Sequence, residues 1–345
     1  MADIPPALSL TGLTKRFGTL SAVDGVSVDI AEGEFFTIVG PSGSGKSTLV
    51  RLLAGLDAPT AGTLHLRGRD ITMTPANRRP TAMVFQSLAL FDHRSVGQNI
   101  EFAMKMKGVA PDARRARALD LLRLVRLPED YYARPVTQCS GGERQRVALA
   151  RALGSDPDIL FFDEPLSAID YRLRKTLEVE LKELHQRTGK TFIYITHSLE
   201  EAMVMSDRIA IMQAGKFVQI GSPDEIYRRP LNRFVASFMG EVNILSVTQT
   251  GGAPVFTDLG QPARGAMGPY GVLRPEALAP GNGGAVAFDA EVTQKLMLGS
   301  RTQYHLRAGN AALIAEVGAA MQANLSIGQT ASFSFDLADI AWVAD

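Results

Sequence analysis

The sequence predicts an α/β domain built around a mostly parallel central sheet, followed by a small all-β domain. Three apolar runs have the length of strands buried on both faces of a parallel sheet: FFTIV (35–39), ILFF (159–162) and TFIYIT (191–196). Longer helical patterns lie between these runs, which is typical of strands joined by crossover helices. In the last part of the chain, these apolar runs and helical patterns are absent. Short runs that alternate apolar and polar residues occur there instead, separated by Gly, Asn or Pro. We therefore expect one domain over 1–240 and a second over 241–345.

Length and composition are those of a two-domain globular protein of 345 residues. Lys+Arg and Asp+Glu both number 36, so the bulk charge argues neither for nor against a nucleic-acid or anionic-membrane partner. The arginine-rich stretch ARRARALDLLRLVRL (113–127) is better explained as a helix with a core stripe and solvated arginines than as a nucleic-acid patch. We therefore expect no nucleic-acid partner.

Cysteine content and hydropathy limit the possible compartments. The single cysteine, Cys139, excludes an internal disulfide framework and is typical of a reducing compartment. The start MADIPPALSL lacks the basic region of a signal peptide. No window reaches the roughly 18 to 20 apolar residues of a membrane-spanning helix. Any membrane association is therefore expected to come through a partner.

Four helical patterns link the predicted strands of the first domain. They cover 46–56, 114–126, 143–153 and 170–187. The last ends before Gly189, a residue suited to the left-handed backbone of a C-cap. In SPDEIYRR (222–229), Ser222 has the N-cap position and Glu225 lies three residues later, with Pro223 at the first helical position. This segment predicts a late helix of the first domain.

The second predicted domain differs in composition. It holds 13 of the 32 glycines, and its 5 Lys+Arg are outnumbered by 9 Asp+Glu. Runs such as VAFDAEV, TQYHLR and ASFSFDL alternate apolar and polar residues between turn signals. Several short strands with frequent turns indicate a small sandwich or barrel.

The segment GPSGSGKST (40–48) fits the phosphate-loop pattern G-x-x-x-x-G-K-[ST] between a predicted strand and a predicted helix. Its glycines let successive N–H groups face one phosphate, and the helix dipole adds to the attraction. Lys46 is expected to reach the β- and γ-phosphates, and Ser47 to offer its hydroxyl to Mg²⁺. The alternative is a Gly-rich turn with a surface lysine. The expected phosphate-binding residues are Gly40, Pro41, Ser42, Gly43, Ser44, Gly45, Lys46, Ser47 and Thr48.

Two carboxylates follow an apolar strand in ILFFDEP (159–165). Because ligands lie at the carboxyl ends of parallel strands, Asp163 and Glu164 are expected beside the phosphate loop. Asp163 suits Mg²⁺, and Glu164 is placed to orient or deprotonate an attacking water. His197 follows TFIYIT in the same way and is a candidate for contact with the γ-phosphate. The alternatives are a loop cap for the carboxylates and a structural role for the histidine.

With QCSGGERQR (138–146), these motifs together resemble the nucleotide-binding subunit of ATP-binding cassette (ABC) transporters. In that family this stretch is the signature turn, and the resemblance covers essentially the whole chain. The fold it implies is a P-loop NTPase cassette with a helical lobe, followed by a β-rich, OB-like barrel. The ligands it implies are ATP and Mg²⁺, and the implied activity is ATP hydrolysis.

The resemblance adds residues outside the phosphate loop. Phe17 in KRFG resembles the aromatic that stacks on adenine, and Val23 is included among the nucleotide-binding residues. Gln86 in VFQS resembles the glutamine that senses Mg²⁺ and the attacking water, and Asp170 in SAID resembles the aspartate that communicates across the dimer. A half-buried strand aromatic, a solvated loop amide and a helix N-cap stay open as alternatives for Phe17, Gln86 and Asp170. The implied catalytic residues are Glu164, His197 and Gln86, and the implied metal ligands are Ser47, Gln86 and Asp163.

The family resemblance also implies a homodimer. Two subunits enclose two ATP molecules, and each ATP is bound by the phosphate loop of one chain and the signature turn of the other. In this chain the turn contributes Ser140, Gly141, Gly142 and Glu143. ATP then stabilises the closed pair, and hydrolysis allows it to open.

The β-rich second domain narrows the class to importers, because GVLRPEAL (271–278) resembles the Arg-Pro-Glu stretch of their C-terminal domain, the TOBE domain. Several stretches look most like the polyamine (spermidine/putrescine) importers. The region after Gln86, from Ser87 to about Lys107, is expected to accept a helix from two permease subunits, with core packing as the alternative. An extracytoplasmic solute-binding protein is an indirect partner, and the chain is expected at the cytoplasmic face of the inner membrane.

Three alternatives to polyamine import stay open. The same type of ATPase could serve a sugar, ferric iron, sulfate or phosphonate importer. A soluble cassette ATPase is disfavoured by the single phosphate loop and the lack of a sustained heptad. A subunit that binds ATP without hydrolysing it is disfavoured by the presence of Glu164 and His197.

The signature turn has two unusual residues for this family, Cys139 and Glu143. Ser140 and Glu143 have the spacing of a capping box, in which the carboxylate accepts from the N-cap N–H. For Cys139, two interpretations stay open: a small apolar residue under the turn, or a reactive thiol that makes the ATPase sensitive to oxidation.

Overall fold

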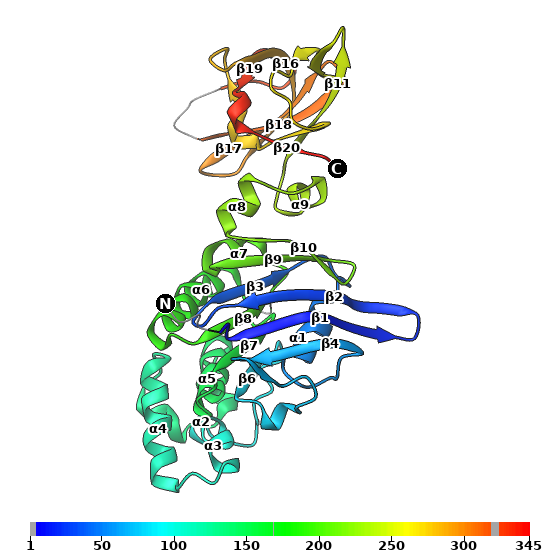
Figure 1. The fold of residues 1–345 in the computed structure, drawn as a ribbon. Coiled ribbons are helices and arrows are strands. Elements are labelled where there is room, and N and C mark those ends of the chain that lie inside the picture. The colour runs from blue at the N-terminus through cyan, green and yellow to red at the C-terminus, as the bar shows by residue number, and fades with distance from the viewer. Residues whose placement is uncertain (1–4, 168, 319–323) are drawn as a thin grey trace. The chain divides into compact units, whose positions relative to one another are not determined.

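The computed structural model describes residues 5–167, 169–318 and 324–345 and divides into two compact units, Met1–Pro223 and Asp224–Asp345. Figure 1 shows the elements of each unit. The first residues of MADIPPALSL and Ala168 of SAID lie outside the described residues. Each unit has a hydrophobic core of its own, as expected for a two-domain chain.

The first unit is organised by a six-stranded sheet in the order β10-β9-β3-β8-β7-β6, in which only β10 is antiparallel to its neighbour. Every residue of β3 and β8 is buried, which explains why their sequences are continuous apolar runs. The three strands predicted from the sequence are β3, β7 and β8, and all are confirmed. The strand bounds are β3 (Phe35–Val39), β6 (Thr81–Val84), β7 (Ile159–Asp163), β8 (Thr191–Ile195), β9 (Arg208–Gln213) and β10 (Lys216–Gly221).

A second, antiparallel sheet of the first unit has the order β2-β1-β4-β5. One hydrophobic cluster joins residues of this sheet to α1 and to one face of the central sheet. The strand bounds are β1 (Leu8–Phe17), β2 (Leu20–Ile30), β4 (Ala61–Leu66) and β5 (Arg69–Asp70).

Helices α2 to α5 form the lobe that the family resemblance implied, next to β6 and β7 in Figure 1. The four predicted helices of the first unit are confirmed as α1, α4, α5 and α6, with ends that differ by a few residues. Gly189, at φ 61°, ends α6 as predicted. The bounds are α1 (Lys46–Leu53), α2 (Val96–Ile100), α3 (Phe102–Met106), α4 (Pro111–Leu124), α5 (Gly141–Gly154), α6 (Tyr171–Thr188) and α7 (Leu199–Met205), with 3₁₀ turns η1 (Ala76–Arg78), η2 (Glu129–Ala133) and η3 (Val136–Gln138).

Helix α4 buries Ala118, Leu121 and Leu122 and leaves most of its arginines on the outside, as the sequence indicated. Among the described residues, the helices are all too short or too polar to cross a bilayer.

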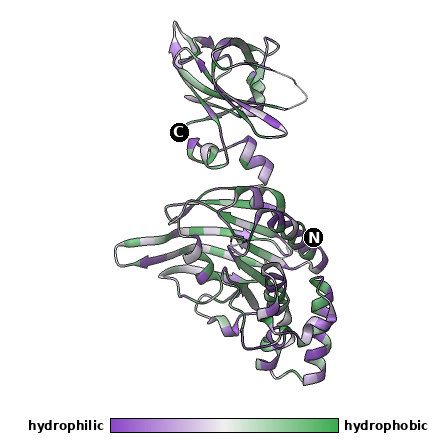
Figure 2. Ribbon diagram, turned by 180° about the vertical axis from the view of Figure 1, so that it is seen from behind, coloured by the Kyte–Doolittle hydropathy of each residue, from purple (hydrophilic) through white to green (hydrophobic). Residues whose placement is uncertain are grey.

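The second unit contains two five-stranded sheets, in the orders β13-β12-β11-β14-β20 and β15-β19-β16-β17-β18, that share one hydrophobic cluster. All of its strand pairs are antiparallel, consistent with the predicted OB-like barrel. The alternation along these strands can be followed in Figure 2. The bounds are α8 (Pro223–Arg228), α9 (Arg233–Phe238), β11 (Asn243–Thr250), β12 (Ala253–Phe256), β13 (Gln261–Pro262), β14 (Tyr270–Leu273), η4 (Pro275–Ala277), β15 (Ala279–Pro280), β16 (Val286–Met297), β17 (Arg301–Ala308), β18 (Ala311–Gly318), β19 (Thr330–Phe335), η6 (Leu337–Asp339) and β20 (Ile340–Val343).

The helix predicted near 222–229 is present as α8, and from Asp224 onward it belongs to the second unit. Within that unit, Arg274 of the GVLRPEAL stretch is 7% exposed. Its guanidinium donates to the carbonyls of Tyr227, Ala236 and Glu241 at 3.0 to 3.3 Å. These bonds tie the segment that contains α8 and α9 to the β strands.

Replacing Arg274 by Met should therefore destabilise the second unit. The substitution leaves three carbonyls without their charged donor, a loss of about 2 to 3 kcal/mol in the free energy of unfolding. Trp342 is the only tryptophan of the chain and lies in β20, so its fluorescence during urea unfolding reports on this unit. The control is Arg264→Met at an exposed position, which should leave the transition unchanged. Equal midpoints for Arg274→Met and the wild type would contradict this role.

Candidate nucleotide site

The phosphate loop begins at the end of β3 and leads into α1, with the backbone conformation that its glycines predicted. A Cβ on Gly40 would lie 2.2 Å from the Met212 carbonyl oxygen. Gly45 has φ 106°, and its Cβ would lie 2.2 Å from the Ala22 carbonyl oxygen. Only glycine fits either position. Pro41, Ser42 and Gly43 are exposed and open to a ligand.

The Lys46 side chain is buried inside the phosphate loop and binds two of its backbone carbonyls. It is 7% exposed, and its Nζ donates to the carbonyls of Gly40 at 2.8 Å and Pro41 at 3.0 Å. Burial lowers the pKa of the Lys46 amine, while the negative charges of Glu164 and Asp163 act in the opposite direction. The lysine therefore lies in the field of both predicted carboxylates, as the sequence order implied.

The rest of the loop offers polar groups for a phosphate. Ser44 Oγ is buried and has no hydrogen-bond partner among the described residues. Ser47 is exposed and Thr48 is half-buried. A buried hydroxyl without a partner beside a glycine cradle fits a phosphate ligand.

Asp163 and Glu164 lie where β7 ends, beside the strand that leads to His197. Burial, and then the neighbouring Glu164, raise the pKa of the Asp163 carboxyl, and Lys46 partly offsets the rise. Glu164 has φ 46°, a left-handed backbone that is strained for a residue with a Cβ. Its N–H donates to the Ile195 carbonyl at 2.9 Å, and its carboxylate lies 3.1 Å from His197 Nδ1. The structure thus brings Glu164 and His197 into direct contact.

Gln86 reaches the same place from β6. Its Nε2 donates to Ser167 Oγ at 3.1 Å, and that hydroxyl donates to the Glu164 carbonyl at 2.9 Å. Ser167 was not among the predicted site residues. In the sequence, the only indication that Ser167 belongs to the site is that it places a hydroxyl three residues after Glu164.

Phe17 and Val23 have different environments. Phe17 is 52% exposed, with Lys15 Nζ 5.2 Å from its ring centroid, so its face is available to a planar ligand. Val23 has no exposed surface and belongs to the core cluster of the first unit. The expected contact between Val23 and nucleotide is therefore not supported, because this side chain packs inward.

The signature turn has the predicted capping box. Ser140 N–H donates to Glu143 Oε2 at 2.7 Å, and Glu143 N–H donates to Ser140 Oγ at 3.4 Å. Tyr131 OH donates to the other carboxylate oxygen at 2.7 Å. This bond and the Ser140 N–H lower the pKa of the Glu143 carboxyl. The glutamate is thus held within the turn as an ionised capping group, and its carboxylate oxygens are bound by Ser140 and Tyr131.

The glycines of the turn are not equivalent. A Cβ on Gly141 would meet nothing within 4 Å, whereas a Cβ on Gly142 would lie 3.0 Å from Leu173 Cδ2. At Gly142, α5 approaches Leu173 of α6 closely, and a side chain there would displace the leucine methyl. Gly141 and Ser140 are exposed and available to a second molecule.

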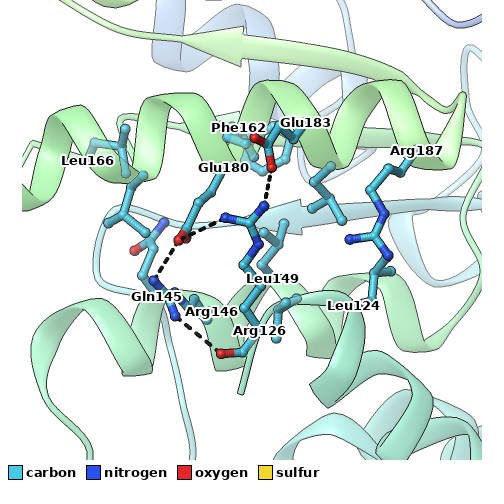
Figure 3. Close-up of a pocket in the computed structure, with 14 residues that line it drawn as sticks. Leu124, Arg126, Gln145, Arg146, Leu149, Phe162, Leu166, Glu180, Glu183 and Arg187 are labelled. Atoms are coloured by element: carbon cyan, nitrogen blue, oxygen red, sulfur yellow. Dashed lines mark hydrogen bonds and ion pairs between the residues drawn. The ribbon is translucent and has the colours of Figure 1, made fainter. Parts of the chain in front are cut away.

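Asp170 is the N-cap of α6, where its side chain accepts from Leu173 N–H at 3.1 Å. Helix α6 is also joined to α5 and to the segment that follows α4 by charged pairs around a mostly apolar pocket (Figure 3). Arg146 donates to Glu180 at 2.8 Å, and Arg126 pairs with Glu183. Asp170 thus caps α6, as the N-cap alternative held. Its carboxylate is exposed, and its role in communication across a dimer stays a prediction.

Comparisons with known proteins identify the family. A model described as ABC transporter matches residues 23–167, and a model described as TOBE domain matches residues 271–343. The spermidine/putrescine import ATP-binding protein PotA of Mesorhizobium japonicum is 51% identical over 257 residues, which are 73% of this chain and 70% of that protein. The chain belongs to the ABC transporter ATP-binding proteins. The protein of the same description from Rubrobacter xylanophilus is 44% identical over 318 residues, 88% of this chain and 84% of that protein.

Solved ABC cassettes have the same fold. The dimeric structure of the bacterial ABC transporter cassette MJ0796 is 30% identical, with a TM-score of 0.56, and covers 63% of this chain and 98% of that chain. The cbiO1 subunit of Clostridium perfringens is 27% identical, with a TM-score of 0.60, and covers 64% of this chain and 90% of that chain. The predicted fold class and family are confirmed. ABC ATP-binding proteins of importers hydrolyse ATP to power transport, and this chain is such an ATPase.

The stretch from Ser87 to about Lys107, which was predicted to accept a permease helix, is only partly exposed. Ile100 and Met104 are buried in the lobe, as the core-packing alternative held. Phe91 and Phe102 are half-buried, with ring centroids 4.6 Å apart and the Arg94 guanidinium 4.8 and 5.0 Å from them. This aromatic pair, the half-buried Leu88 and Leu90 and the exposed Met106 are among the apolar groups that remain accessible.

Cys139 lies under the signature turn of this ABC protein with 8% of its surface exposed, among the apolar residues of the lobe. Burial and the neighbouring Glu143 raise the pKa of the thiol. Since the thiolate is the reactive form, the structure favours the apolar interpretation over the redox interpretation.

We therefore expect a disulfide-type thiol reagent at neutral pH to modify Cys139 slowly in the folded chain. The reagent should react rapidly once the chain is unfolded in denaturant, because burial then no longer raises the pKa. ATP hydrolysis should be equally insensitive to the reagent in the wild type and in Cys139→Leu. Loss of activity in the wild type alone would restore the redox interpretation.

Proposed function

We propose that the chain is the ATP-hydrolysing subunit of a polyamine importer. The observation that carries the proposal is the contact of Glu164 with His197, beside the phosphate loop that holds Lys46. The polyamine assignment is supported by the relatives described as spermidine/putrescine import ATP-binding proteins, at 41% to 51% identity.

In the proposed reaction, ATP phosphates occupy the loop around Gly40–Thr48 and adenine lies on the exposed face of Phe17. Glu164 accepts a proton from the attacking water, and His197 holds the carboxylate through its Nδ1 contact at 3.1 Å. Gln86 orients the water from the end of β6, the strand next to β7. Asp163, Ser47 and Gln86 would hold Mg²⁺, which neutralises phosphate charge when bound.

The site is completed by a second copy of the chain. The exposed Ser140 and Gly141 lie at the N-terminus of α5, where free N–H groups attract an anion. We propose that Ser140, Gly141 and Gly142 face the γ-phosphate bound by the partner chain in the closed homodimer, with Asp170 near the same interface. The solved cassette MJ0796, which is described as dimeric, supports the dimer in this proposal.

Partners in the membrane follow from the same proposal. Two permease subunits would each insert a short helix against the stretch after Gln86, where Phe91, Phe102 and Met106 remain accessible. The chain would then lie at the cytoplasmic face of the inner membrane. An extracytoplasmic solute-binding protein would act only through the permeases, and no nucleic acid is required.

The role of Glu164 can be tested by Glu164→Gln. We expect phosphate release to fall by a factor on the order of 10² or more, because the amide cannot accept the proton. ATP binding should be retained, and the variant should form a stable ATP-dependent dimer in size-exclusion chromatography. The control, Glu129→Gln, removes an exposed carboxylate in η2 and should hydrolyse ATP normally. Unchanged phosphate release in Glu164→Gln would exclude this base.

The solute can be tested by uptake of radiolabelled spermidine and putrescine in cells that carry the gene, lack it, or carry Glu164→Gln. We expect uptake to require the wild-type gene and to be lost in the variant, because import is coupled to hydrolysis. Labelled maltose, ferric iron, sulfate and phosphonate serve as parallel arms. Uptake of one of these, and not of polyamines, would leave the ATPase intact and overturn the polyamine assignment.

A further inference from the structure

The loop after Gln86 contains two consecutive residues in a strained conformation. Leu88 has φ 59° and Ala89 has φ 47°, both in the left-handed region. A residue with a Cβ adopts this region at a cost in free energy, and neither position is a glycine. Some interaction must therefore hold the pair in place.

That interaction comes from Arg151 on α5, the helix that begins at the signature turn. Its Nη2 donates to the Leu88 carbonyl at 2.6 Å, and its Nη1 donates to the Ala89 carbonyl at 2.5 Å. One planar guanidinium therefore binds two carbonyls that face it because of the left-handed turn. A lysine has no such fork and cannot serve both carbonyls with the same geometry.

A second residue of the lobe fixes the next part of the loop. Asn99 on α2 is fully buried, and its amide binds both backbone groups of Phe91, at 2.9 Å to the N–H and 3.2 Å to the carbonyl. The loop is thus held by two helices of the lobe, α2 and α5.

On its other side the same loop reaches the backbone of Glu164, the residue that carries the proposed catalytic carboxylate. Gln86 donates to Ser167 Oγ, which donates to the backbone carbonyl of Glu164. A continuous path therefore runs from Arg151 through Leu88 and Ala89 to Gln86. From there it passes through Ser167 to the strained backbone of Glu164.

We propose that Arg151 is a positioning residue for ATP hydrolysis. It holds Leu88 and Ala89 in the left-handed turn that places Gln86 against Ser167, and so fixes Gln86 relative to Glu164. The helix that carries the signature turn thereby sets the geometry of the loop that follows Gln86. The inference rests on the proposed catalytic role of Gln86, and the experiment separates the two.

The test compares Arg151→Met, Arg151→Lys, Ala89→Gly and the double variant Arg151→Met with Ala89→Gly in the full-length chain. Ala89 is exposed, so its replacement by glycine removes the left-handed strain and little packing. We expect Arg151→Met to lower kcat for ATP hydrolysis about tenfold to a hundredfold, with KM for ATP nearly unchanged, because the phosphate loop is untouched. Arg151→Lys should give an intermediate kcat.

The decisive result is the double variant. If Arg151 acts by holding the left-handed turn, Ala89→Gly should restore a large part of the lost kcat, because glycine adopts the turn without the guanidinium. If Arg151 only stabilises the lobe, Ala89→Gly restores nothing, and the loss of kcat follows the loss of thermal stability. A rise in KM equal to the fall in kcat would also overturn the proposal.

Gln86→Ala separates this inference from the role on which it rests. Full activity in Gln86→Ala would remove the proposed role of Gln86, whatever Arg151 does. Low activity in Gln86→Ala together with normal kcat in Arg151→Met would overturn the positioning role alone. If Arg151→Met fails to fold, Arg151→Lys with and without Ala89→Gly provides the same comparison.

Discussion

Four neighbouring parallel strands, β3, β8, β7 and β6, determine where the chemistry of this protein lies. Parallel pairing makes all four end at one edge of the sheet, and each is followed by a site residue or loop. The phosphate loop follows β3, His197 follows β8, Glu164 follows β7 and Gln86 follows β6. Every residue of β3 and β8 is buried, and β6 and β7 continue the same parallel register, so site residues more than 100 positions apart in the sequence are brought together.

The opposing charges at this edge are held close together by burial. Burial raises the pKa of Asp163 and lowers that of Lys46, and each group partly offsets the shift of the other. A triphosphate and its metal ion bring both signs of charge to the same place. When a nucleotide binds, Asp163 and Lys46 exchange one set of charged partners for another. This exchange costs less free energy than the desolvation of an isolated ion.

The sequence was sufficient wherever a residue type alone specifies a backbone conformation or a burial pattern. The strands, the glycines of the phosphate loop, the capping box of Ser140 and Glu143, and the end of α6 at Gly189 are of this kind. It was insufficient where a side chain binds a distant carbonyl. The contacts of Ser167 with Glu164, of Arg151 with Leu88, and of Arg274 with Tyr227 leave no periodicity or motif. The burial of Val23 could not be predicted for a related reason, because it depends on how β2 packs.

Non-glycine residues with a left-handed backbone lie on two sides of the reacting centre, at Glu164 and at Leu88 and Ala89. Such conformations persist only where the surroundings supply more bonds than the strain costs. At Glu164 the bond is the N–H to Ile195, within the sheet; at the other two it is the guanidinium of a lobe helix. The first anchor belongs to the sheet, and the second belongs to α5. Under the proposed roles, a displacement of α5 relative to the sheet would change the position of Gln86 without moving the Glu164 backbone, so the orientation of water would be separable from the acceptance of its proton.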